Sequence, residues 1–428
     1  MDINVFNLDK PINKIYNFQK EQYVKINPSA DSITCLNQAG NIVFSSTVLS
    51  DALYIPNSFI MAEFNLMDST NTKLLGAENV TLENNFFPRC FSQMEMQIGS
   101  STIEVLDEPG ESETLLKLVR YDKTYAKTYG QMEGWIIDTG DGKLTKAEPL
   151  TEANYLAINK GYAVRKNIYN NKHKQYTIIW RLFPLFAMAE NYSVLKAVSF
   201  KLILKRKINN EEIFYGKGGV AKLRFNKMEW YLPLYTPSLE NEKKLNKILI
   251  SNDEIKFPLL KRTLFTTSIN SAIHDWEIAS ISNNPRFILV GFKDATAPSY
   301  GKNDHRYIGK IKDKYIKSIR LDLNTTKYPN DEFLEINATN NSFSEFYNYY
   351  SICVEIYLVY PHNLIQLIKL FHIFFDFTSQ PEDIKEAGIR VTLRIRLSDA
   401  MNLTAYALVL EDSIQVINIP RNSTMRIE

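Results

Sequence analysis

The 428-residue sequence is poor in the residue types that build metal sites and disulfides. Its three cysteines, Cys35, Cys90 and Cys353, are far apart, and none belongs to the CxxC pair that a structural zinc site needs. Five histidines occur, and none has HxxxH or HExxH spacing. We therefore expect no metal ion and no cofactor, and a chain synthesised in a reducing compartment such as the cytoplasm.

The sequence also has no large excess of positive or negative charge and few long apolar runs. Lys and Arg total 50 against 48 Asp and Glu, so the net charge of +2 does not indicate a dedicated nucleic-acid-binding protein. The N-terminus, MDINVFNLDK, lacks the apolar segment of a secretory signal. The most apolar stretch, Leu364–Phe377, contains Lys369 and Asp376 and is shorter than the roughly 20 residues that span a bilayer. We expect neither secretion nor a transmembrane segment.

Motifs of the common enzyme classes are missing too. No GxSxG nucleophile elbow occurs, and GKGG at residues 216–219 lacks the spacing of a phosphate-binding loop. Asp304 and His305 are adjacent and have no third group beside them in the sequence, which favours a solvated pair over acid–base chemistry. We expect no catalytic residues.

Strict alternation of apolar and polar side chains, typical of strands with one buried face, recurs along the chain. The clearest case is FSQMEMQIGSSTIEV, residues 91–105, in which Gly99 and Ser100 supply a turn between two strands. The pattern predicts a β-hairpin. Its inward-facing residues are expected to be Met94, Met96, Ile98, Ile103 and Val105.

Other segments repeat this alternation. VSFKLILKRK should bury Phe200, Leu202 and Leu204, and RVTLRIRLSD should bury Val391, Leu393, Ile395 and Leu397. Further strands are predicted in NIVFSST, SFIMAEFNLM, PRFILVGF, TAYALVL and IQVINI. Helices are predicted only for short segments, among them ESETLLKLVR and SFSEFYNYY at 342–350. Because helices do not alternate with the strands, the sequence predicts an all-β fold.

The two halves of the chain share this organisation. A hairpin followed by a helix is predicted at residues 91–120, and IKSIRLDLN, in which Ile319, Leu321 and Leu323 alternate, leads to the helix predicted at 342. VAKLRFNKMEWYLPLYTP is interpreted as a closing strand that Pro233 and Pro237 should end. The charged segment that follows, 238–250, is interpreted as a helical linker. The sequence predicts two domains, 1–240 and 241–428.

An ordered set of segments resembles the double jelly-roll major capsid proteins of the Polinton (Maverick) and adintovirus-like group. These segments are WYLPLYTPS at 230–238, HDWEIASISNNPRFILVGF at 274–292, SIRLDLNTTKYP at 318–329 and the final TAYALVLEDSIQVINI. The first half is similar more loosely, in DINVF, the hairpin and IIWRLFPLF. Two departures are Leu232-Pro233-Leu234, where relatives often have Pro-His-Val, and Lys293, where a Gln is common.

The resemblance implies two eight-stranded antiparallel jelly-roll sandwiches with a few short helices. It further implies a homotrimer that forms pseudo-hexameric capsomers of an icosahedral virion around double-stranded DNA. Expected partners are neighbouring capsomers and the penton and minor capsid proteins. Two turn-rich segments, 121–162 and 293–312, are expected to be long insertions that form outer towers and contacts between subunits.

Alternative interpretations remain at this point. One is a lectin-like sandwich that binds glycans, and another is a two-carboxylate glycosidase with Glu229 and Asp275 as partners. The lysines of NKHKQY and KLILKRK are candidates for weak, non-specific contact with packaged DNA. The aromatic stripe of 342–350 is predicted to face the core, and a subunit interface is the alternative. Its members are Phe343, Phe346, Tyr347 and Tyr350.

Overall fold

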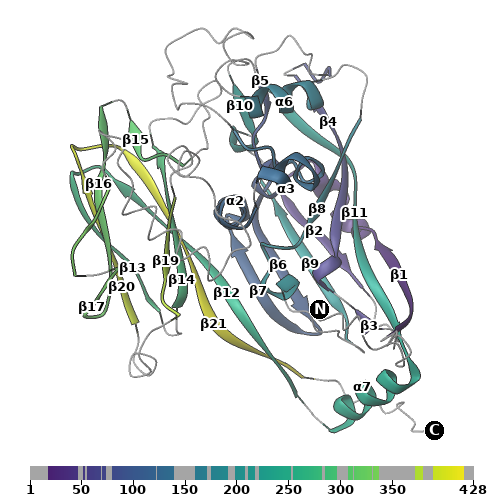
Figure 1. Cartoon of the computed structure of the whole chain (residues 1–428). Helices are drawn as coiled ribbons and strands as arrows, with labels where there is room; N and C mark the ends of the chain where they lie inside the picture. The colour runs from purple at the N-terminus through teal and green to yellow at the C-terminus, as the bar shows by residue number, and fades with distance from the viewer. Residues whose placement is uncertain are drawn as a thin grey trace, which may run out of the picture.

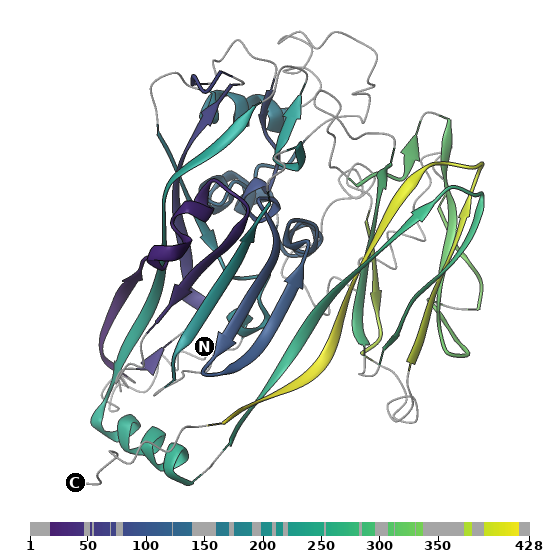
Figure 2. The same cartoon turned by 180° about the vertical axis from the view of Figure 1, so that it is seen from behind.

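The structure is a computed structural model of the chain. It describes residues 18–46, 52–53, 55–68, 70–73, 80–121, 123–138, 160–170, 175–190, 198–207, 211–216, 221–251, 254–281, 285–295, 307–311, 313–329, 331–336, 372–378 and 389–418. The two halves of the chain lie side by side and are joined at one end through helix α7, as both views show (Figures 1 and 2).

The first half contains two packed antiparallel sheets. One has the order β1-β11-β4-β8, with β3 paired to β11, and the other has the order β2-β9-β6-β7. A separate ladder joins β5 and β10. The strands are β1 Phe18–Ile26, β2 Gly40–Ser45, β3 Ala52–Leu53, β4 Phe59–Met67, β5 Val80–Leu82, β6 Phe91–Ile98, β7 Ser101–Asp107, β8 Tyr176–Arg181, β9 Phe200–Arg206, β10 Phe214–Gly216 and β11 Lys222–Pro237.

The second half also contains two antiparallel sheets. Their orders are β12-β21-β14-β19 and β13-β20-β16-β15, with β17 and β18 also paired to β16. The strands are β12 Glu254–Ile269, β13 Ile273–Ile281, β14 Pro285–Asp294, β15 Lys310–Ile311, β16 Lys314–Leu323, β17 Thr326–Tyr328, β18 Leu334–Glu335, β19 His372–Asp376, β20 Ile389–Leu397 and β21 Leu403–Asn418.

The two halves have the same connectivity. When the main strands of each half are counted along the chain, one sheet holds the first, eighth, third and sixth, and the other holds the second, seventh, fourth and fifth. In the second half β17 occupies the fifth place. This order is that of a jelly roll, so the fold predicted from the sequence, a double jelly roll, is confirmed. The alternating segments around Met94 and Ile319 are the fourth strand of their respective halves.

Short helices decorate the sandwiches. The α-helices are α1 Phe86–Arg89, α2 Pro109–Arg120, α3 Lys123–Lys127, α4 Tyr129–Met132, α6 Lys160–Tyr169 and α7 Leu239–Ser251. The 3₁₀ helices are η1 Ala30–Ser32, η2 Thr34–Leu36, η3 Ile55–Asn57, η4 Ala187–Glu190 and η5 Glu211–Ile213. The helices predicted at ESETLLKLVR and in the charged linker are confirmed as α2 and α7. The predicted helix at 342–350 lies outside the described residues.

The predicted hairpin is confirmed. β6 and β7 pair antiparallel, and the chain reverses at Gly99, whose φ of +61° favours glycine. Met94, Met96 and Ile98 are all buried, as the alternation requires. A positive φ thus explains why this glycine stands between two regular strands.

The prediction that Val105 faces the core is wrong. Val105 is 43% exposed, and its neighbour Glu104 is buried. The register of the two strands shifts beside Met96, and this irregularity places Ile103 and Glu104 both inside. Beyond a bulge, the side chains that would face the core face solvent and the reverse. Alternation in the sequence alone cannot indicate where such a bulge occurs.

Two strand boundaries also differ from prediction. Pro233 lies inside β11, which runs on to Pro237 beside β1. TAYALVL and IQVINI form one continuous strand, β21, which pairs with β12 along 16 residues. Pro233 pairs with Tyr23 of β1, and Asp412 pairs with Leu260 of β12. A neighbouring strand on one side is therefore enough to continue each strand through a position that looks like a break. The other predicted strands are confirmed.

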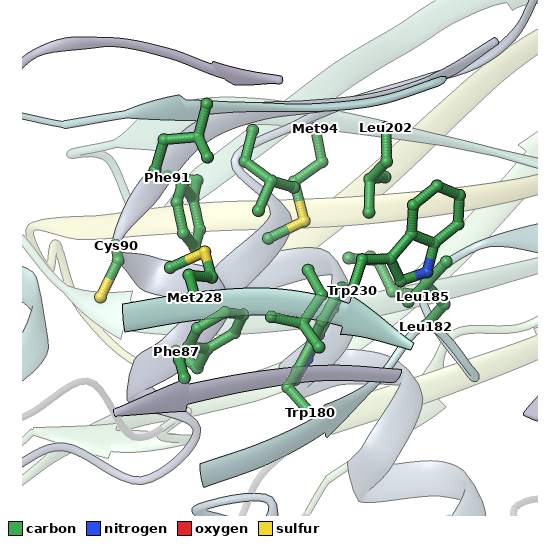
Figure 3. Packing of buried hydrophobic residues seen from close by; sticks show 14 of the residues in the cluster. Phe87, Cys90, Phe91, Met94, Trp180, Leu182, Leu185, Leu202, Met228 and Trp230 are labelled. Atoms are coloured by element: carbon green, nitrogen blue, oxygen red, sulfur yellow. The ribbon is translucent and has the colours of Figure 1, made fainter. Parts of the chain in front are cut away.

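Each sandwich has its own hydrophobic core. In the first, Met94 and Leu202 on one sheet point toward Met228 and Trp230 on the other (Figure 3). Trp180, from β8, is fully buried in the same cluster. In the second, inward residues of β14, β16 and β20 form a separate cluster. Burial of these side chains from both sheets is the main stabilising contribution within each half.

Candidate functional site

The feature that distinguishes this chain from two independent sandwiches is the junction between its halves. Helix α2 lies beside the second half in both views (Figures 1 and 2). A third hydrophobic cluster joins α2 and the segment after it to the sheet β12-β21-β14-β19. Its buried members are Leu115, Leu116, Leu118, Val119, Tyr121, Trp135, Ile137, Phe287, Leu289, Tyr307, Phe374, Leu408 and Leu410.

The sheet β12-β21-β14-β19 is buried on both faces. Its inner face packs in the core of the second half, and its outer face packs in the junction. On β14, Ile288 and Val290 point into the second core, whereas Phe287 and Leu289 point into the junction. A strand buried on both faces has a continuous apolar run instead of alternation, as FILV does here. That run was a signal for the junction that the sequence-based prediction did not use.

The predicted insertion 121–162 is only partly a loop. Its described residues include α3, α4 and the first residues of α6, and both Trp135 and Ile137 are buried in the junction cluster. The described residues of the insertion 293–312 include Tyr307, which is also buried there. These parts of both insertions therefore connect the two halves of one chain.

A buried ionic cluster centres on Glu111 of α2. Its Oε1 accepts hydrogen bonds from Arg89 Nη1 and from Lys293 Nζ, each at 2.5 Å. Its Oε2 accepts one from the Tyr307 hydroxyl at 2.8 Å. Arg89 and Glu111 belong to the first half, and Lys293 and Tyr307 to the second. One carboxylate thus binds two cations and a phenol across the junction.

The pKa values in this cluster are strongly perturbed. Burial lowers the pKa of Lys293 to about 8, although Glu111 acts in the opposite direction. Burial and the nearby Glu111 carboxylate raise the pKa of Tyr307 well above its usual value. Burial opposes the charge of Arg89, but the attraction of Glu111 and Glu83 outweighs it and raises its pKa. Near neutral pH the cluster therefore contains two cations and a neutral phenol.

A second ionic cluster crosses the junction at Glu190 of η4. Arg262 of β12, which is fully buried, forms an ion pair with it at 2.6 Å, and Arg120 of α2 forms another. Nearby, the backbone N–H groups of Ala187 and Met188 donate to the buried carboxyl of Glu104 at 2.7 and 2.8 Å. Burial raises the pKa of Glu104. The bulge that turns Glu104 inward thus serves this end of the junction.

The charged residues of α2 are held within the first half too. Lys117 forms ion pairs with Glu113 at 3.2 Å and with Glu133 at 3.4 Å, and all three side chains are almost completely buried. Trp180 Nε1 donates to both Glu113 oxygens at 2.9 and 3.1 Å. Burial raises the pKa of Glu113. Buried charges are tolerated only when paired, so these contacts fix the position and rotation of α2.

The carboxylates considered for a glycosidase are not brought together. Glu229 lies on β11 in the first half, where Lys25 and Lys227 pair with it at 3.0 and 2.9 Å. Asp275 lies on β13 in the second half and pairs with Arg394 at 2.7 Å. Hydrolysis by this mechanism needs two carboxyl groups facing one bond, and these belong to different sandwiches.

The remaining sequence candidates are dispersed. Among the described residues, no group of three or more His, Cys, Asp or Glu side chains could hold a metal ion. Asp304, His305 and most of GKGG and NKHKQY lie outside the described residues. In the part of the chain that the structure describes, no helix is long and apolar enough to cross a membrane.

Comparison with known proteins agrees with this architecture. Residues 149–415 match the family of double jelly roll-like domains, and the chain belongs to this family. A chain of the Sputnik virophage is similar at 10% identity, with 99% of this chain and 94% of that chain covered and a TM-score of 0.65. A search of curated proteins finds no match to the sequence.

Two further solved structures have the same fold. The mavirus major capsid protein is 9% identical, with 97% of this chain and 93% of that chain covered and a TM-score of 0.57. The Faustovirus major capsid protein is also 9% identical, with 96% and 91% covered and a TM-score of 0.56. At these identities the likeness establishes the fold.

Proposed function

We propose that this chain is the major capsid protein of an icosahedral virion that encloses double-stranded DNA, assembled as a homotrimer into pseudo-hexameric capsomers. The observation that carries the proposal is the repeated strand order of two sandwiches joined by a buried junction. A trimer of such chains offers six similar flanks, which suit a hexagonal lattice position. Likeness to the mavirus and Faustovirus major capsid proteins over nine-tenths or more of each chain supports it.

The domain limits and lineage belong to the same proposal. We place the domains at 1–240 and 241–428, because every described strand pair joins strands of the same side of this boundary. Helix α7, Leu239–Ser251, spans this boundary. The ordered segments that resemble Polinton and adintovirus-like capsid proteins support membership of that lineage.

Partners and location follow from assembly. The chain would be synthesised in the host cytoplasm and would function in the virion capsid without catalysis, in contact with neighbouring capsomers and the penton and minor capsid proteins. Contact with packaged DNA would be weak. Lys205 of β9 is exposed, whereas Arg206 is buried against Phe225, and Lys207 binds Glu108 and Glu212.

Mass photometry and negative-stain microscopy of the purified chain test the proposal. We expect particles of three times the 49.5 kDa chain mass, or closed shells, to form as concentration rises. A chain that stays monomeric at every concentration and forms no particles would contradict it. Glycan arrays would then test the lectin-like alternative.

A further inference from the structure

The equivalent sheets of the two halves differ in what covers them. In the second half, the outer face of β12-β21-β14-β19 is buried against the first half. In the first half, the equivalent sheet is β1-β11-β4-β8, and its inner face is in the first core. Its strand β1 lies on the side of the first half remote from the second half in both views (Figures 1 and 2).

The outer face of this sheet is apolar and aromatic at its centre. Tyr231 of β11 stacks on Phe59 of β4 with ring centroids 4.9 Å apart, and Tyr23 of β1 lies 5.6 Å from Phe59. The next row contains Met61, paired in register with Ile179 of β8. Their neighbours along each strand point into the core, so these five side chains share the outer face, which we call the β1–β8 face.

Exposed apolar side chains extend the β1–β8 face at both edges. Tyr23 is 46% exposed at one edge, and Tyr129 and Met132 of α4 are 54% and 45% exposed next to β8 at the other. Arg181 of β8 lies over the Tyr129 ring at 5.5 Å. Tyrosine, methionine and arginine are enriched at protein interfaces relative to the remaining surface.

The same face also carries charged residues on its central strand β11. Glu229 lies on the same side of β11 as Tyr231, whose hydroxyl donates to it at 3.1 Å, and Lys25 and Lys227 pair with it while remaining about half exposed. Glu229 is paired in register with Met61, so its two ion pairs lie within the face, next to the apolar side chains. The carboxylate considered above for a glycosidase therefore forms part of the β1–β8 face.

We propose that the β1–β8 face binds a second copy of this chain, which covers it with the second half of that copy. The inference rests on the proposed capsid function and deepens it. The reason comes from the equivalent sheet of the second half, β12-β21-β14-β19. Its outer face is covered by the first half of the same chain. Applying the same contact between chains makes a head-to-tail interface, the kind of interface from which closed rings such as the proposed trimer are built.

Tyr23 and Met132, at opposite edges of the face, are suited to a test. Both side chains are exposed, so substituting them should leave the hydrophobic cores intact. We expect Tyr23→Glu and Met132→Glu each to raise the dissociation constant of the trimer about 30-fold or more, because each would bury an unpaired carboxylate in the contact. Ile248→Glu is the matched control, since Ile248 is a similarly exposed apolar residue, 50% exposed, on α7 and outside both sandwiches. Dilution series by mass photometry measure the effect, and circular dichroism verifies folding.

A photo-crosslinker in place of Tyr23 identifies the occupant. Mixed isotope-labelled and unlabelled chains should give crosslinked peptides between copies, joining position 23 to residues beyond 240. Crosslinks to the first half of another copy, or trimers of both glutamate variants that dissociate like the wild type, would overturn the inference. A wild-type chain that never trimerises would instead overturn the capsid proposal itself.

Discussion

Glu111 is the residue on which the orientation of the two halves should depend most. Glu111→Gln retains the size of the side chain but leaves Arg89 and Lys293 buried without the carboxylate that both contact at 2.5 Å. Removing one partner of a buried pair costs roughly 3–5 kcal/mol. Lys293 limits the loss, because its pKa of about 8 would fall further and leave it neutral near pH 7. We therefore expect the free energy of unfolding to fall by about 3 kcal/mol.

Urea unfolding at pH 7 measures this loss, and a double-mutant cycle assigns it to the cluster. Lys293→Met in the Glu111→Gln background should recover part of it, with a coupling energy of about 1.5–3 kcal/mol. Glu240→Gln is the control, because Glu240 pairs with Lys244 on the exposed surface of α7, and its loss should leave the urea midpoint close to that of the wild type. A Glu111→Gln loss as small as that of the control, or strictly additive variants, would refute the reasoning.

Three further predictions concern single positions. Because the pKa of Lys293 falls from 10.5 to about 8 on folding, its charge costs stability below pH 8. The wild type should gain about 3 kcal/mol relative to Lys293→Met between pH 8 and 10.5, and parallel pH profiles from chemical unfolding would contradict this. Gly99→Ala should cost about 1 kcal/mol through its positive φ alone, since no atom lies near the added methyl. Ser100→Ala, the control, should not lower the melting temperature, and equal melting temperatures for both variants would count against this account. Gly291→Ala would place a methyl 2.4 Å from the Tyr307 ring. We expect a loss of about 1–3 kcal/mol by urea unfolding, and an unchanged midpoint would mean that the junction is looser than the structure indicates.

Local patterns predicted the elements of the fold well. Alternation identified β6, β9, β16 and β20, and the pair Gly99-Ser100 identified the turn. These succeed because the period of a strand and the φ of a turn residue depend on a few neighbouring residues. The failure at Val105 has the converse cause, since the bulge that turns Glu104 inward depends on pairing with another strand.

The junction could not be predicted in the same way. In ESETLLKLVR the charged residues suggest a solvated helix face, yet Glu111, Glu113 and Lys117 are buried. Their partners are distant in sequence: Lys293 is 182 residues from Glu111, and Trp180 is 67 from Glu113. No local spacing connects such residues. The sequence comparison with the capsid proteins that this chain resembles singled out Lys293 as a departure, but it could not indicate the contact of Lys293 with Glu111.

The sequence by itself determined that this chain is all-β, that its halves repeat one pattern of strands, and which residues most strands turn inward. Those properties follow from the two-residue period of a strand, which can be recognised within each short segment by itself. Only the tertiary structure decided that α2 lies between the halves and that the sheet β12-β21-β14-β19 is buried on both faces. It also decided that the equivalent sheet of the first half leaves its outer face, the β1–β8 face, uncovered within the chain. Which face is covered depends on where whole sheets pack, and that is set by contacts between residues a hundred or more positions apart.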